Sequence, residues 1–203
     1  MVDPESKTAQ RRILTAAKRV FLSKGMAGAR MQDIADTAGI NKAMLHYYFR
    51  SKQKLFDKIM SDAVANFFPR VVGILNGDLP LAEKIQCFAA EYVDMLLENP
   101  YLPLFVLNEA SLHPARFAKR WWKDRESPFT EFARQVESEV AARNIKPVHP
   151  LQLVINMLSL CIFPFISRPI WTQTTGIDEE GFRAFMLLRK TEIPRFIMDA
   201  IKN

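Results

Sequence analysis

The apolar residues of this chain recur at the spacing of α-helices along most of its length. Near the N-terminus they follow the i, i+1, i+4, i+7, i+8 pattern that gathers side chains on one face of a helix. These positions are Ile13, Leu14, Ala17, Val20 and Phe21. The alternation of Val, Ile and Thr that predicts half-buried strands is almost absent. The pattern therefore predicts an all-α fold.

Glycines and capping residues divide the first part of the chain into four predicted helices. Gly25 and Gly39 are placed to end the first and second helices, because glycine adopts the left-handed conformation common just after a helix. Asn41 and Ser51 are suitable N-caps for the third and fourth. After the first helix, the predicted ranges are Met31–Ala38, Lys42–Phe49 and Lys52 to about Phe68.

Prolines punctuate the rest of the chain. Pro4 is the only one before Pro69, and the other prolines of the 12 follow it. Between them the apolar spacing predicts helices at Leu81–Glu98, Tyr101–Ser111, Arg116–Lys123, Pro128–Arg143, Pro150–Phe163 and Asp178–Ile201. Pro194 falls inside the last range, but the apolar phase continues across it, which favours a kinked helix over two separate ones.

Composition indicates a folded, soluble chain. The 203 residues are 49% hydrophobic and 25% charged, and a chain of this length buries roughly 70% of its unfolded surface. There is no run of 18 apolar residues and no apolar leader, so we expect a cytoplasmic protein rather than an exported or membrane-inserted one. Cys87 and Cys161 lack metal-ligand spacing and are expected to be buried thiols, without a metal or other cofactor.

The positive charge is concentrated at the N-terminal end. Residues 1–60 hold 12 Lys and Arg against 5 Asp and Glu, which gives 12 − 5 = +7. Residues 61–203 hold 16 against 17, which gives −1. This asymmetry indicates a polyanionic partner for the N-terminal part. Charge alone leaves open nucleic acid, an anionic membrane surface or simply a solvated face.

Two short helices joined through Gly39-Ile40-Asn41 fit a helix-turn-helix. The segment GMAGARMQDIADTAGINKAMLHYYFRSKQKLF, which begins at Gly25, resembles the DNA-binding signature of TetR-family transcriptional regulators. The resemblance covers about residues 8–60 and implies a helix-turn-helix DNA-binding domain at residues 1–52. It also implies a helical ligand-binding and dimerisation domain at residues 53–203.

The predicted third helix has a packing face and a DNA-facing side. Leu45 and Phe49, four residues apart, should pack it onto the first two helices. Lys42 is positioned for a guanine edge and Ala43 or Met44 for a thymine methyl group, while the resemblance implies phosphate contacts for Tyr47 and Lys52. The expected DNA-contacting residues are Arg30, Asn41, Lys42, Ala43, Met44, His46, Tyr47 and Lys52.

Two of these residues depart from the family pattern. His46 stands where tyrosine is most common, so an imidazole replaces the expected phenol and would make binding depend on pH. Arg30 stands where Ser or Thr commonly caps the second helix, so the cap is expected to be lost, although a guanidinium there can still reach a phosphate.

The region after residue 80 is rich in large soft and aromatic side chains interleaved with a few polar ones. This mixture, with the resemblance, predicts a pocket for an apolar or aromatic effector. Its candidate lining is Phe88, Tyr92, Met95, Phe105, Asn108, Glu109, His113, Phe117, Trp121 and Trp122.

Two apolar stripes near the C-terminus could close an ordinary core or pair with a second copy as a four-helix interface, and the resemblance favours the second. The stripes comprise Leu151, Val154, Ile155, Leu158, Ile162, Phe182, Phe185, Met186, Ile193, Phe196 and Ile197. A two-fold dimer would require a palindromic DNA operator with half-sites about one helical turn apart.

The leading hypothesis is a homodimeric repressor that an effector releases from its operator. A transcriptional activator and a regulator without a small-molecule effector are the alternatives. An enzyme using Glu109 and His113 as an acid/base pair is a remote one, because no catalytic motif accompanies them. A basic amphipathic helix on a membrane surface is disfavoured, because the apolar face of the first helix has partners in the helix-turn-helix.

Overall fold

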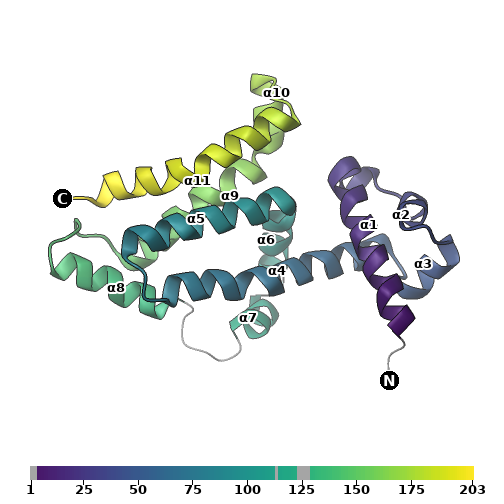
Figure 1. Ribbon diagram of the computed structural model, residues 1–203, viewed down its shortest axis with the longest axis horizontal. Coiled ribbons are helices and arrows are strands. Elements are labelled where there is room, and N and C mark those ends of the chain that lie inside the picture. Colours follow the sequence, from purple (N-terminus) through teal and green to yellow (C-terminus); the bar gives the residue numbers. More distant parts are fainter. Residues whose placement is uncertain (1–3, 113, 123–128) are drawn as a thin grey trace. The chain divides into compact units, whose positions relative to one another are not determined.

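The computed structural model describes residues 4–112, 114–122 and 129–203 (Figure 1). These residues form two compact units that divide between Val64 and Ala65. In the described ranges the secondary structure is helical apart from one isolated antiparallel bridge, between Ile145 and Lys202, which confirms the all-α prediction.

The N-terminal unit contains α1 (Pro4–Gly28), α2 (Met31–Ala38), α3 (Lys42–Tyr48) and the first part of α4 (Lys52–Asn76). Gly25 interrupts the helical conformation of α1, with φ 69° and ψ 170°, where the sequence predicts the end of that helix. The core of this unit includes the fully buried Ile13, Ile34 and Leu45. Burial of these side chains is the main stabilisation available to so short a helical unit.

The turn between α2 and α3 depends on Gly39. Its φ of 64° lies in the left-handed region, which glycine adopts without steric cost. The amide of Gly39 donates to the carbonyl of Asp36 and that of Ile40 to the carbonyl of Ala35, which satisfies the last carbonyls of α2. The helix-turn-helix therefore has the tight turn that the sequence predicts.

Within its described residues, the C-terminal unit contains the rest of α4 and seven further helices. They are α5 (Leu81–Glu98), α6 (Leu102–Leu112), α7 (Pro114–Trp122), α8 (Thr130–Ala141), α9 (Pro150–Ile166), α10 (Arg168–Thr175) and α11 (Glu179–Ile201). Helix α5 packs along α11 and against α9. Across the α9–α11 contact, Phe165 meets the ring of Phe182 edge to face at 5.7 Å.

Two helical features differ from the sequence prediction. The fourth helix continues through Pro69 to Asn76, because Val71 and Leu75 keep its apolar face buried beyond the proline. Helix α10 was not predicted, because it is short and none of its side chains is buried. By contrast, α11 runs unbroken through Pro194, as its continuous apolar phase predicts.

No single described helix combines the length and the apolar composition needed to cross a membrane. Helices α9 and α10 meet both criteria only when taken together, across a bend of 57°.

Candidate nucleic-acid interface

Helix α3 is capped at its start and packed along one face. At its start, the Asn41 side-chain oxygen accepts a hydrogen bond from the Met44 amide at 2.7 Å. Leu45 is fully buried and Phe49 is 7% exposed, which confirms the predicted packing face. The side chain of Asn41 therefore caps the helix, a role that accounts for this residue without a DNA contact.

The opposite side of α3 is open to solvent. Lys42, Ala43, Met44, His46 and Tyr47 are all exposed, and Tyr47 is exposed over 83% of its surface. The centres of the Tyr47 and Tyr48 rings lie 5.4 Å apart, and the two rings are nearly perpendicular. The exposed side of this helix thus presents the ammonium of Lys42, the methyl group of Ala43 and the phenol hydroxyl of Tyr47. Groups of these kinds can contact base edges and phosphates.

The start of α2 is capped without the Ser or Thr that is common there. The Asp33 carboxylate accepts from the Arg30 amide at 3.3 Å and so replaces half of the missing cap. The ammonium of Lys24 lies 2.9 Å from Asp33, and this hydrogen bond holds the pKa of the carboxyl below its ordinary value. Arg30 makes no capping bond with its side chain, which is exposed. Its guanidinium therefore remains available to a phosphate.

Lys52, at the start of α4, points into its own unit. Its ammonium donates to the carbonyls of Met26 at 2.7 Å, Ala29 at 3.0 Å and Ala27 at 3.5 Å. These carbonyls belong to the end of α1 and its connection to α2. Since an ammonium has three protons, these three acceptors use its whole donor capacity. The sequence predicts a phosphate contact for Lys52, and it gives no signal for these hydrogen bonds to the end of α1 and the connection to α2.

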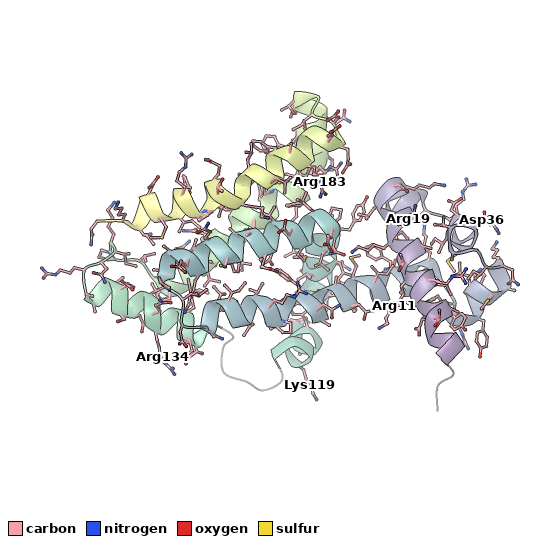
Figure 2. All side chains as sticks on the ribbon, in the orientation of Figure 1. Arg11, Arg19, Asp36, Lys119, Arg134 and Arg183 are labelled. Carbon is pink, nitrogen blue, oxygen red and sulfur yellow. The ribbon has the colours of Figure 1, made fainter. Side chains whose placement is uncertain are left out.

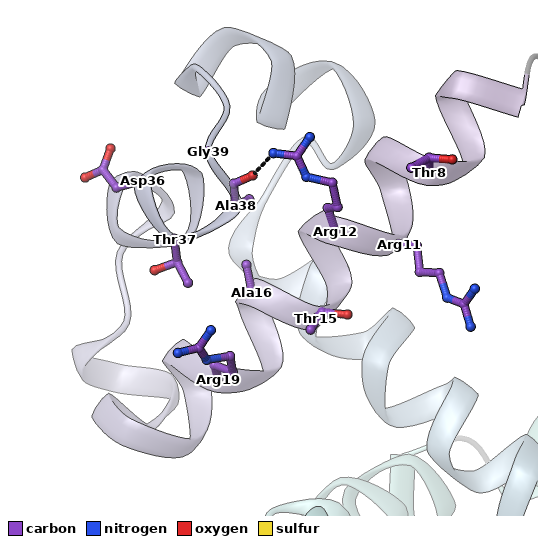
Figure 3. A pocket seen from close by; sticks show the side chains of 10 residues that line it. All are labelled: Thr8, Arg11, Arg12, Thr15, Ala16, Arg19, Asp36, Thr37, Ala38 and Gly39. Carbon is purple, nitrogen blue, oxygen red and sulfur yellow. Dashed lines mark hydrogen bonds between the residues drawn. The ribbon is translucent and has the colours of Figure 1, made fainter.

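A groove of about 560 Å³ runs between α1 and the end of α2 (Figure 3). Arg12 and Arg19 line it from α1, and Arg12 donates to the Ala38 carbonyl at 2.7 Å, beside the Gly39 turn. Asp36 points away from both arginines in this view. The sequence pattern leaves the basic residues of the first helix on its polar side and assigns them no contact. The spacing of Arg12 and Arg19, seven residues apart, was the available signal that they share one side.

The cations of the N-terminal unit thus differ in whether they have a partner within the protein. Lys24 and Lys58 are paired with Asp33 and Asp62, while Arg12 and Lys52 bind carbonyls. Lys42 has neither an ion pair nor a hydrogen bond from its ammonium within the described ranges. Its charge is therefore available to an external anion at the first turn of α3.

The residues predicted to line an effector pocket differ in how far they are buried. Phe88 is buried and packs against Tyr92, whose ring also meets Phe67 at 4.8 Å. Burial of the Tyr92 hydroxyl raises its pKa. Met95, Phe105, Glu109 and Phe117 are half-buried, and Asn108 is exposed. His113 and the side chains of Trp121 and Trp122 lie outside the described residues.

Five of the residues predicted for a dimer interface are buried within the C-terminal unit. Val154, Phe182, Met186, Ile193 and Ile197 are each at most 3% exposed, so they cannot contact a second copy in this conformation. Four of the five lie on the side of α11 that packs along α5, and Val154 lies on α9, which also contacts α5.

The remaining members of the two stripes are accessible. Leu151, Ile155, Phe185 and Phe196 are exposed, and Phe196 is exposed over 65% of its surface. Leu158 and Ile162 are half-buried. We refer to Leu151, Ile155, Phe185 and Phe196 as the outer stripe. An apolar surface of this kind is typical of an interaction site.

Comparison with known proteins connects the N-terminal unit to one family. Residues 13–59 match the model described as bacterial regulatory proteins, tetR family. The chain is similar to the HTH-type transcriptional repressor NicS of Pseudomonas putida, with 42% identity over 55 residues, which are 27% of this chain and 26% of NicS. It is also similar to the HTH-type transcriptional repressor KstR2 of Mycolicibacterium smegmatis, with 32% identity over 85 residues, 41% of this chain and 42% of KstR2. Less than half of each relative is therefore matched.

The similarity of fold extends over nearly the whole chain. A transcriptional regulator of the TetR/AcrR family from Thermobifida fusca superposes with a TM-score of 0.64 and 22% sequence identity, over 96% of this chain and 98% of that one. At this identity the likeness concerns the fold alone. The sequence match and the fold match agree on the N-terminal helix-turn-helix.

Proposed function

We propose that this chain is a DNA-binding transcriptional regulator of the TetR family that acts through the exposed side of α3, because residues 13–59 match the model of that family of bacterial regulatory proteins. The observation that carries the proposal is the contrast along this helix. Leu45 is fully buried, whereas Lys42 and Tyr47 are exposed and the Lys42 ammonium is unpaired within the described ranges. The relatives named above are transcriptional repressors, which supports a regulatory role rather than a catalytic one.

The proposed contacts fall into two groups. Lys42, Ala43 and Met44 lie at the start of α3, where a recognition helix reaches base edges. Arg30, His46 and Tyr47 are assigned to the phosphate backbone, where they fix the position of the helix. We leave Lys52 out of the proposed contacts, because its three donors bind carbonyls within the unit.

We further propose a homodimer formed through the outer stripe, acting on a palindromic operator in the cytoplasm. Leu151 and Ile155 on α9, and Phe185 and Phe196 on α11, supply the apolar surface that two copies would bury. The proposed regulation is repression that a small apolar effector releases. NicS and KstR2 are both named transcriptional repressors, which supports repression rather than activation. Such an effector must bind more tightly to the form with low DNA affinity.

A salt titration with a random-sequence duplex tests DNA binding before any operator is known. Arg30→Ala should reduce the steepness of the plot of log affinity against log salt concentration by about 1, the value for one lost phosphate contact. Lys58→Ala is the matched control, because Lys58 is already paired with Asp62 at 2.7 Å and should leave the slope unchanged. Absence of duplex binding by the unmodified protein, or equal slopes for both variants, would contradict the proposal.

A further inference from the structure

A cavity of about 550 Å³ lies in the C-terminal unit between α9, α10 and α11. This volume falls within the range of small-molecule sites. Its lining is mainly apolar and aromatic, with Leu160 and Phe163 from α9, Trp171 from α10, and Phe182 and Met186 from α11. None of the residues predicted for the effector pocket lines it. The cavity is therefore a separate candidate site.

Arg189 is the only charged residue among those that line this cavity. Its Nη2 group donates to the Leu160 carbonyl at 2.7 Å. Its Nε is buried without a hydrogen-bond partner, and no carboxylate in the described ranges forms an ion pair with it. Burial lowers the pKa of the guanidinium. A positive charge in an apolar setting without a counter-ion is costly, and an anionic group beside it would offset that cost.

The walls of the cavity are held in place by contacts of their own. The Trp171 indole N–H donates to the Ser167 hydroxyl at 2.7 Å, and that hydroxyl donates to the Phe163 carbonyl at 2.7 Å. The guanidinium of Arg168 lies 4.9 Å from the centre of the Phe182 ring. Side chains fixed in this way lose little conformational entropy when a ligand binds.

We propose that this cavity binds an apolar molecule that carries one carboxylate. The apolar part lies against Phe163, Trp171 and Met186, and the carboxylate meets the outer nitrogens of Arg189. The Nε group is not the point of contact, because it lies beneath the surface. A single arginine balances a single negative charge, which favours a carboxylate over a doubly charged phosphate. As a carboxylate site the cavity stands alone; only its use by a regulatory effector rests on the proposed function.

Isothermal titration calorimetry with decanoate and its neutral counterpart decanamide tests the assignment. The unmodified protein should bind decanoate saturably and at least about tenfold more tightly than decanamide, as expected for a charge-assisted hydrogen bond. Arg189→Gln should remove this preference. The matched control is Arg183→Gln, because Arg183 is an exposed cation of the same helix outside the cavity lining (Figure 2). It should retain the preference.

A folding control is needed because Arg189 also donates to Leu160. If Arg189→Gln lowers the melting temperature, the Arg189→Lys variant is titrated in its place. This variant keeps the positive charge, so it should still prefer decanoate, with a lower affinity than the unmodified protein. Trp171→Ala should weaken the binding of decanoate and decanamide by a similar factor, because it removes an apolar side chain of the lining and keeps the charge of Arg189.

Three results would overturn the proposal: equal affinity for decanoate and decanamide, equal losses in the Arg189 and Arg183 variants, or decanoate binding confined to monomeric protein. The last would assign the cavity to contacts with a second copy, since Phe185 belongs both to its lining and to the outer stripe. Sedimentation velocity on the titrated samples identifies that case. Because DNA binding is measured separately, a failure here leaves the proposed function intact.

Discussion

Lys52 is a charged side chain whose hydrogen bonds serve the fold of the N-terminal unit. Its ammonium joins the start of α4 to three carbonyls at the end of α1 and the connection to α2. A cation so placed holds the start of α2, and with it Arg30, in position. Nearby, Arg12 does the same for the end of α2 through the Ala38 carbonyl.

Replacement of Lys52 by methionine, which keeps most of the apolar stem, should lower the free energy of unfolding by about 1.5–3 kcal/mol, because hydrogen bonds to a charged group are lost. The salt dependence of DNA binding should not change. Lys54→Met, a change at an exposed neighbour on the same helix, should alter stability by less than about 0.5 kcal/mol. Urea unfolding and a salt titration measure the two effects. A slope reduced by about 1 with unchanged stability would restore the phosphate contact.

The two cysteines should differ in reactivity. Cys161 is buried, and burial raises the pKa of its thiol to about 12, against a smaller lowering effect of Arg189. Because the thiolate is the reactive form, Ellman's reagent at pH 8 should modify Cys161 only after unfolding. The half-buried Cys87 should react first. Cys87→Ser should therefore remove the fast phase, and a fast phase that persists in this variant would contradict the burial of Cys161.

At the scale of elements, the turn between α2 and α3 sets the direction in which α3 leaves α2. Gly39→Ala places a Cβ at a φ of 64° and 3.1 Å from the Nη2 of Arg12. We expect the free energy of unfolding to fall by about 1–2 kcal/mol, the cost of left-handed backbone for a residue with a side chain.

Gly73→Ala is the matched control, because Gly73 lies inside α4 and an added Cβ meets nothing within 4 Å. This change should raise the free energy of unfolding by about 0.5–1 kcal/mol. Urea unfolding of both variants measures the difference. A destabilisation of equal size in both would show that the Gly39 turn carries no special conformational requirement.

A helix can be predicted from the sequence when its own apolar spacing and its flanking residues indicate it. The ranges of α2 and α5 follow directly from the apolar spacing and the flanking residues, such as Gly39 and Pro80. Helix α10 has no buried residue to produce such spacing. At Pro69 the local signal for a break is overridden by burial of Val71 and Leu75, which depends on packing within the C-terminal unit.

The candidate sites show the same limit. The packing role of Leu45 and the exposure of Lys42 follow from helical periodicity. Periodicity gives no distances between helices, so it could not reveal that Lys52 reaches the carbonyl of Met26. Nor could it separate the two sides of α11, where Ile193 is buried and Phe196 is exposed.

For the whole molecule, the proposed dimer depends on the outer stripe. Phe196→Glu should shift the protein to monomers in sedimentation velocity, because a carboxylate buried in an apolar interface lacks a partner. Leu107→Glu is the control, because Leu107 is an exposed apolar residue of α6 outside the stripe, and it should leave the dimer intact. Dimers that persist in the Phe196 variant would exclude the outer stripe as the interface.

The central claim is that the exposed side of α3 reads DNA sequence in two symmetric copies. Selection of bound molecules from a pool of random duplexes, followed by sequencing, tests this most directly. The unmodified protein should enrich one palindrome with half-sites about one helical turn apart. Lys42→Ala should relax the preference at the same position of each half-site. Enrichment of no sequence, or of a motif without two-fold symmetry, would contradict the account.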